Sequence, residues 1–145
     1  MKPLAAKETQ TFLEEMPNLV LGTIRRDGSP QASPVWYLWT GKSFLISTIS
    51  SVAKWHNVQR DPRCSVCVDD PSTGRMVVAY GRALLHSGDV RDRTKALVEK
   101  YYPGKPDAAN AHLERIFTGP DQRVLIEVFP SALIPRRLDV GDADA

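Results

Sequence analysis

The sequence predicts a single domain built on an antiparallel β-barrel with peripheral helices. Three observations predict it: alternating strand-like segments recur along the chain, turn residues join most of them directly, and short amphipathic helices separate the others. Direct hairpin connections favour antiparallel pairing, because parallel strands need a long crossover between them. A chain of 145 residues is of ordinary length for one domain and can bury a core.

Six segments have the composition of strands. The first two are joined by Asp27-Gly28, the strongest hairpin signal in the chain. Pro34 lies inside the second segment and cannot donate to a strand ladder, so we expect an edge position, a bulge or a backbone left open to a ligand. The expected strands are residues 19–26, 31–39, 43–49, 63–69, 75–87 and 122–129.

Four segments are expected to form helices. The second should be capped by Ser50 or Ser51 and end at Asp61-Pro62, and the third should be capped by Asp89. The small, acidic tail 139–145 is expected to be disordered, which leaves residues 1–138 as the domain. The expected helices are residues 7–16, 51–60, 89–102 and 107–117.

Composition and motifs exclude several functions. The net charge of +2, without a dense run of Lys and Arg, disfavours nucleic-acid binding. No apolar stretch reaches transmembrane length and no signal peptide is visible, so we expect a cytoplasmic protein without membrane contact. Cys64 and Cys67 fall on one strand and point to opposite faces, so we expect free thiols and no metal site. His56, His86 and His112 lack the sequence context of a catalytic triad.

The most informative segment runs from Phe44 to Lys54, where a strand, a hydroxyl-rich turn and a helix start follow one another. Hydroxyls, free backbone N–H groups and an ammonium together favour binding of a phosphate. An aromatic strand nearby, with Trp36, Tyr37 and Trp39, suggests a phosphorylated cofactor that carries a ring. The alternative is a capped helix with a solvated lysine, which the residues alone favour.

Trp36 and Trp39 are expected on opposite faces of the strand 31–39, so one of them should face outward. An outward aromatic side chain favours a subunit interface, and hence a dimer. The alternative is that the helix 89–102 covers it within one chain.

Several short stretches, in this order and spacing, resemble one family across residues 8 to 135. Taken together they resemble the split β-barrel, pyridoxamine phosphate oxidase-like superfamily, and within it the B-type deazaflavin (coenzyme F-420)-dependent oxidoreductases. The matching stretches are Leu21 to Pro30, Ser33 to Tyr37, Ser47-Thr48, Lys54, Asn57, Arg60 to Arg63 and Tyr80 to Ala83.

This resemblance implies a six-stranded antiparallel Greek-key split barrel of the FMN-binding type. It also implies a homodimer with cofactor sites at the interface, where the segment around Met76 approaches the partner's site. Many relatives have an arginine where this chain has Val52 or Ala53, so phosphate neutralisation should fall mainly on Lys54. The implied cofactor-binding residues are Ser33, Val35, Trp36, Tyr37, Ser47, Thr48, Ala53, Lys54, Asn57, Met76 and Val77.

The resemblance implies an oxidoreductase that transfers a hydride from reduced coenzyme F-420 to a conjugated small-molecule acceptor. Tyr37, Tyr80 or water could donate the proton, and the sequence does not select among them. One alternative is an FMN-dependent oxidoreductase of the same fold. Another is a non-catalytic binder of deazaflavin, flavin or haem, for which His56 or His86 would be the axial ligand. A basic groove would favour F-420, whose tail is acidic, and its expected residues are Arg25, Arg26, Lys42 and Arg60.

Overall fold

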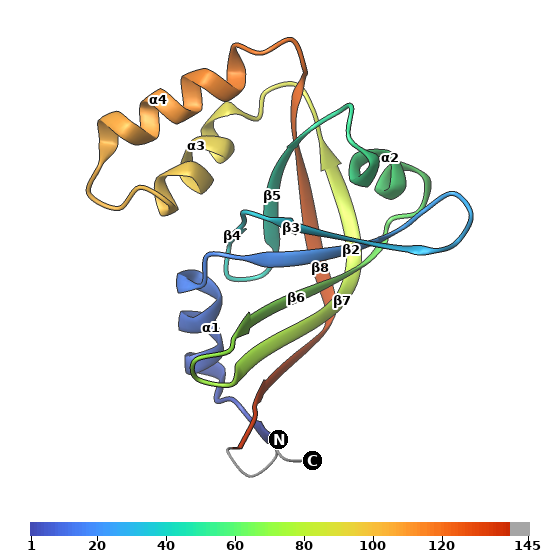
Figure 1. Cartoon of the computed structure of the whole chain (residues 1–145), viewed down its shortest axis with the longest axis vertical. Helices are drawn as coiled ribbons and strands as arrows, with labels where there is room; N and C mark the ends of the chain where they lie inside the picture. The colour runs from blue at the N-terminus through green and yellow to red at the C-terminus, as the bar shows by residue number, and fades with distance from the viewer. Residues whose placement is uncertain (140–145) are drawn as a thin grey trace.

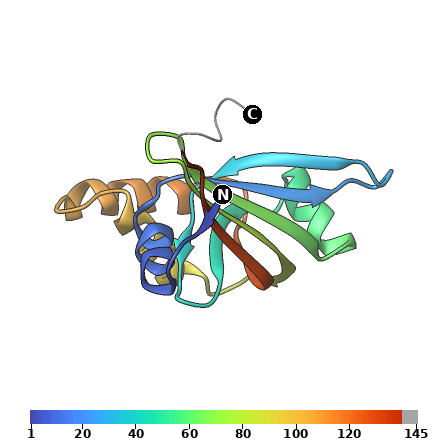
Figure 2. The ribbon, with the colours of Figure 1, turned by 90° about the horizontal axis from the view of Figure 1, so that it is seen from below.

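The computed structural model describes residues 1–139 and shows one curled antiparallel sheet of eight strands with four helices around it (Figures 1 and 2). This confirms the predicted fold class but not the predicted number of six strands, because residues 2–3 add a short strand and the predicted strand 31–39 divides into two. Along the sheet the order is β3-β2-β6-β7-β8-β5-β4, and β1 pairs with β8. The strands are β1 Lys2–Pro3, β2 Leu19–Ile24, β3 Pro30–Val35, β4 Leu38–Trp39, β5 Phe44–Ile49, β6 Arg63–Asp70, β7 Arg75–His86 and β8 Arg123–Arg137.

The predicted strand 31–39 is wrong in one respect, because the chain breaks at Trp36 and Tyr37. Its first part, β3, pairs with β2 at one edge of the sheet, and its second part, β4, pairs with β5 at the other edge. The backbone N–H of Tyr37 donates to the Tyr101 hydroxyl at 2.9 Å instead of to a strand. Pro34 lies in the edge strand β3, as predicted.

The helices confirm the predicted segments but not the predicted caps. The N-cap of α2 is Val52 and that of α3 is Val90, and neither supplies a side-chain cap. Ser51 instead donates to Asp121 at 3.3 Å. None of the helices in the described range is long and apolar enough to cross a membrane. The helices are α1 Ala6–Glu15, α2 Ala53–Arg60, α3 Arg91–Lys100 and α4 Pro106–Phe117.

The main core lies inside the curled sheet, and α1 covers part of it with Phe12 and Leu13. The buried aromatic side chains there have partners for their polar groups, as buried Tyr and Trp generally require. The Tyr37 hydroxyl donates to the Leu13 carbonyl at 2.6 Å, and the Trp39 indole N–H donates to Gln10 Oε1 at 2.7 Å. These bonds fix α1 against the segment that crosses from β3 to β4.

Cys64 and Cys67 are free thiols, as predicted, with Cys64 buried and Cys67 half-buried. Burial raises the pKa of the Cys64 thiol to about 11, so it stays protonated near neutral pH. Of the expected tail, residues 140–145 lie outside the described residues. Asp139 is described, and its carboxylate lies 3.5 Å from Lys2 Nζ.

Gly81 marks a β-bulge between β7 and β8, where Tyr80 faces Ala132 but Gly81 faces Pro130. A Cβ at this position would collide with the Phe129 carbonyl oxygen, which belongs to the backbone and cannot rotate away. We therefore expect Gly81→Ala to lower the free energy of unfolding by about 2 kcal/mol, measured by urea denaturation. The control is Gly119→Ala, where a Cβ would meet nothing within 4 Å. Equal stability of the two variants would contradict the constraint.

Candidate functional site

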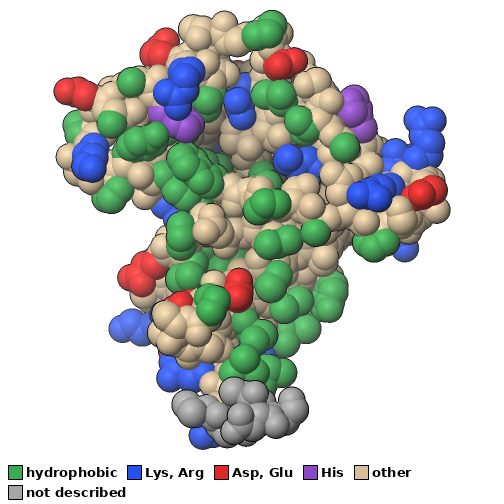
Figure 3. All heavy atoms as spheres, in the orientation of Figure 1, with side chains coloured by type: hydrophobic (Ala, Val, Ile, Leu, Met, Phe, Trp, Pro, Cys, Tyr) green, Lys and Arg blue, Asp and Glu red, His purple; other side chains and the backbone are tan. Residues whose placement is uncertain are grey.

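A cavity of about 420 Å³ lies between the sheet and the helix pair α3–α4. Figure 3 shows the hollow between these helices and α2, with basic side chains inside and beside it. Its volume is within the range of sites for small molecules and cofactors. The lining residues are Pro34, Val35, Trp36, Ser47, Thr48, Ile49, Lys54, Leu97, Val98, His112, Ile116 and Arg123.

Five of the predicted cofactor-binding residues line this cavity together. Val35 and Trp36 come from the end of β3, Ser47 and Thr48 from the end of β5, and Lys54 from the first turn of α2. The sequence placed the last three in one segment. The fold brings the β3 end to them by carrying the chain from one edge of the sheet to the other.

The other six predicted residues do not line the cavity in this chain: Ser33, Tyr37, Ala53, Asn57, Met76 and Val77. Tyr37 is fully buried with its hydroxyl bound to the Leu13 carbonyl, and burial raises its pKa far above the usual range. Its side chain therefore faces the core and cannot donate a proton into the cavity. Val77 is also buried in the core of this chain.

Asn57 positions α2 instead of lining the cavity. Its amide nitrogen donates to Thr23 Oγ1 at 3.1 Å and to Gln31 Oε1 at 2.9 Å, and its oxygen accepts from Arg60 at 3.0 Å. These bonds hold α2 against β2 and β3. They thereby fix the place of Lys54 one turn earlier on the same helix.

Arg123 is the principal residue that the sequence reasoning missed. It begins β8 and pairs with Ile49 at the end of β5, which brings it to the cavity wall beside Ser47 and Thr48. The residues around Arg123 do not indicate that it lies at the cavity, because the pairing of β8 with β5 depends on the order of strands in the whole sheet. Arg123 thus brings a guanidinium to the cavity in a chain that lacks arginine at Val52 and Ala53.

Two buried side-chain atoms within residues 1–139 lack a hydrogen-bond partner, Ser47 Oγ and Arg123 Nε, and both residues line this cavity. An unpaired buried polar group costs about 1–3 kcal/mol, so such groups are rare away from functional sites. Burial also lowers the pKa of Arg123, opposed by the nearby Asp121. The N-terminus of α2, which has no side-chain cap, adds free N–H groups and a positive dipole end next to Lys54. This arrangement fits an anion such as a phosphate.

Another part of the cavity wall is aromatic. The Trp36 indole stacks on Tyr101 with ring centroids 4.0 Å apart and planes at 6°, and it also stacks on His112 at 5.3 Å and 22°. Trp36 remains 38% exposed. Residues at the end of α3 and on α4 therefore cover part of this ring within one chain.

Three of the four cations of the predicted basic groove lie near one another, around the turn between β2 and β3. Arg25 and Arg26 are exposed in the turn between β2 and β3, and Arg60 donates to the Ile24 carbonyl at 2.8 Å, beside that turn. Lys42 does not join them, because it lies in the turn before β5, at the opposite end of that strand from Ser47.

Neither histidine predicted as a haem ligand lines the cavity. His56 is exposed on α2, and His86 Nε2 lies 2.9 Å from Glu127 Oε1. Among the described residues, no group of three or more His, Cys, Asp or Glu side chains could hold a metal ion.

Comparison with known proteins agrees with this architecture. Residues 5–128 match the pyridoxamine 5'-phosphate oxidase family. A conserved hypothetical protein from Mycobacterium tuberculosis superposes with a TM-score of 0.78 at 22% identity, over 98% of this chain and 95% of that one. An F420 reductase superposes with a TM-score of 0.67 at 24% identity, over 86% and 94%.

An FMN-binding protein related to pyridoxamine 5'-phosphate oxidase, from Nostoc punctiforme, superposes with a TM-score of 0.67 at 20% identity, over 93% and 85% of the two chains. At these identities the superpositions show a shared fold. The family match extends over most of the chain, from α1 through the buried part of β8. The chain therefore belongs to the pyridoxamine 5'-phosphate oxidase family of split-barrel proteins.

Proposed function

We propose that this protein is an oxidoreductase that transfers a hydride from reduced coenzyme F-420 to a conjugated small-molecule acceptor. The observation that carries the proposal is that two buried polar atoms, Ser47 Oγ and Arg123 Nε, have no hydrogen-bond partner among the described residues. Both belong to residues that line the cavity together with Lys54 and Trp36. When bound, the deazaflavin would supply the hydride. The chain itself would bind the phosphate, orient the ring and exclude water.

The cavity residues divide into two groups with different tasks. Lys54 and Arg123 would neutralise the phosphate, and the Ser47 hydroxyl would donate a hydrogen bond to a phosphate oxygen. Val35 and Trp36 would form the wall for the ring, and Leu97 of α3 would help to keep water out from the opposite side. A polar end and an apolar wall in one cavity suit a cofactor that is both phosphorylated and aromatic.

The charge distribution favours F-420 over FMN. Arg25, Arg26 and Arg60 lie around the tip of the β2–β3 hairpin and the C-terminal end of α2, and Lys54 lies in the first turn of that helix. The acidic tail of F-420 could follow α2 toward these cations, whereas FMN has no such tail. An FMN-dependent oxidoreductase on the same fold is the competing proposal.

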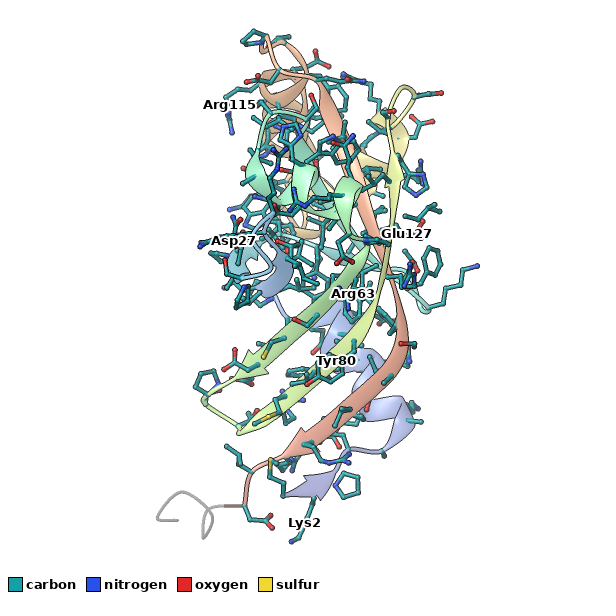
Figure 4. All side chains as sticks on the ribbon, turned by 90° about the vertical axis from the view of Figure 1, so that its right-hand side faces the viewer. Lys2, Asp27, Arg63, Tyr80, Arg115 and Glu127 are labelled. Atoms are coloured by element: carbon teal, nitrogen blue, oxygen red, sulfur yellow. The ribbon has the colours of Figure 1, made fainter. Side chains whose placement is uncertain are left out.

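The second part of the proposal is a homodimer. Four large apolar side chains are exposed on the outer face of the sheet, on β2, β7 and β8, and Figure 4 shows Tyr80 on this face. Tyr80 is 53% exposed and Leu84 is 52% exposed. Large apolar side chains exposed on one face of a sheet are typical of protein interfaces. The four residues are Val20, Tyr80, Leu84 and Phe129.

The first experiment is a paired fluorescence titration of the purified protein with F-420 and with FMN. We expect tighter binding of F-420, weakened by added salt because its tail would contact exposed cations. Tighter binding of FMN would support the competing proposal, an FMN-dependent oxidoreductase of the same fold. If the protein bound neither F-420 nor FMN, the proposed function would be wrong.

Lys54→Ala tests the anion end of the cavity. We expect it to weaken cofactor binding by about 1.5–3 kcal/mol, because it removes a charge-assisted hydrogen bond to the phosphate. Lys42→Ala, at the far end of β5, is the matched control and should bind like the wild type. An unchanged dissociation constant for Lys54→Ala would show that the phosphate lies elsewhere.

Arg123→Met should separate binding from stability. Removing a half-buried cation whose buried Nε has no partner should raise the free energy of unfolding of the ligand-free protein by about 1 kcal/mol, while cofactor affinity falls. Urea denaturation and the titration above measure the two effects, with Lys42→Met as the control for loss of a charge. If Arg123→Met were less stable than the wild type but bound the cofactor with normal affinity, Arg123 would serve stability and not binding.

Light scattering tests the dimer at micromolar concentration. We expect twice the chain mass for the wild type and the chain mass for Leu84→Glu combined with Tyr80→Glu, because charges on the outer face would oppose association. A wild-type protein with the mass of one chain would contradict the proposed interface.

A further inference from the structure

His112 is a cavity residue to which the proposed function assigns no task. It lies on α4, lines the cavity, and stacks on Trp36. One edge of its ring is held firmly: Nδ1 lies 3.0 Å from Arg115 Nη2 and 3.0 Å from the Tyr102 hydroxyl. Figure 4 labels Arg115 at the helical end of the molecule. The other edge of the ring, with Nε2, has no hydrogen bond to any described residue.

These partners decide which nitrogen carries the proton. Arginine only donates hydrogen bonds, so His112 Nδ1 must accept from Arg115, and the Tyr102 hydroxyl donates to the same nitrogen. A neutral ring that accepts at Nδ1 carries its proton on Nε2. Burial, Arg115 and Arg123 lower the pKa of His112, which keeps the ring neutral near pH 7.

We propose that His112 donates its Nε2–H to a carbonyl oxygen of the molecule that occupies the cavity. The inference rests on the proposed function for the identity of that molecule. The carbonyl could belong to the cofactor ring or to the hydride acceptor, and both would present the same chemistry to the imidazole. His112 would thus determine specificity, because an occupant of this end of the cavity would need a hydrogen-bond acceptor.

For an acceptor with a carbonyl conjugated to a double bond, the donor has a defined task. Hydride transfer would break a C–H bond of the reduced cofactor and form a C–H bond at the β-carbon of the acceptor. The electron pair of the C=C bond would then form the new double bond to the carbonyl carbon, and the π pair of the carbonyl would move onto its oxygen. His112 Nε2–H would stabilise that negative charge without giving up its proton. Water would then protonate the α-carbon, and the hydroxide left behind would take the proton that the oxidised cofactor releases. The acceptor thus gains two electrons and two protons, and the cofactor loses two of each.

The test uses His112→Phe, which can keep an aromatic ring against Trp36 but has no donor. His56→Phe, on the exposed face of α2, is the matched control. Nitrogen NMR of the wild-type protein should show a protonated Nε2 and an unprotonated Nδ1. The Nε2–H signal should shift when oxidised F-420, FMN or 1,4-naphthoquinone is added.

The variant separates the two sources of the carbonyl. About tenfold weaker binding of the oxidised cofactor by His112→Phe identifies the cofactor ring, whereas unchanged cofactor binding with about tenfold lower kcat for naphthoquinone identifies the acceptor. A proton on Nδ1, or wild-type values for both quantities in His112→Phe, would overturn the inference. If the wild type binds neither cofactor, the proposed function fails, and the NMR titration with naphthoquinone alone still decides the role of His112.

Discussion

The burial of Tyr37 is the constraint on which the barrel and the cavity both depend. Its ring is fully buried, its hydroxyl binds the Leu13 carbonyl, and its carbonyl accepts from Lys100 Nζ at 3.1 Å. Lys100 also lies 3.7 Å above the Tyr37 ring, and desolvation lowers its pKa to about 8. These contacts tie α1, α3 and the β3–β4 segment together. With Tyr37 turned inward, the preceding Trp36 turns outward to the cavity.

The cavity carries a conflict between stability and binding. Ser47 and Arg123 present buried polar atoms without partners, which destabilises the ligand-free protein. Both atoms belong to residues at one end of β5 and β8, beside the uncapped start of α2. A ligand that satisfied them would bind more tightly because the protein has already met the desolvation penalty during folding. Such sites are where a protein is expected to depart from its stability optimum.

The helix pair α3–α4 has two tasks in this arrangement. α3 packs on the sheet beside β5, Leu113 packs α4 against α3, and the pair brings His112 to the cavity. The stack from Tyr101 through Trp36 to His112 joins these tasks, because the same ring contacts that pack the pair also set the orientation of the imidazole. Substitutions in the loop after α3 should therefore change the orientation of Trp36 and His112 in the cavity.

By itself, the sequence determined the features that depend on neighbouring residues. The hairpin at Asp27-Gly28, the edge position of Pro34 and the segment that joins Ser47, Thr48 and Lys54 all follow from local backbone chemistry. The resemblance added the family, and the structure and the family match confirm it. Period-two alternation could not reveal that Tyr37 leaves the strand, because the tertiary contacts of its ring and backbone decide that break.

Only the tertiary structure decided which distant residues complete the site. Arg123 reaches the cavity because β8 pairs with β5 in the register Ile49 to Arg123. His112 reaches it because α4 packs on α3 and its ring stacks on Trp36. Strand register and helix packing depend on the whole buried surface. The patterns within 122–129 and 107–117 therefore could not predict that Arg123 and His112 reach the cavity.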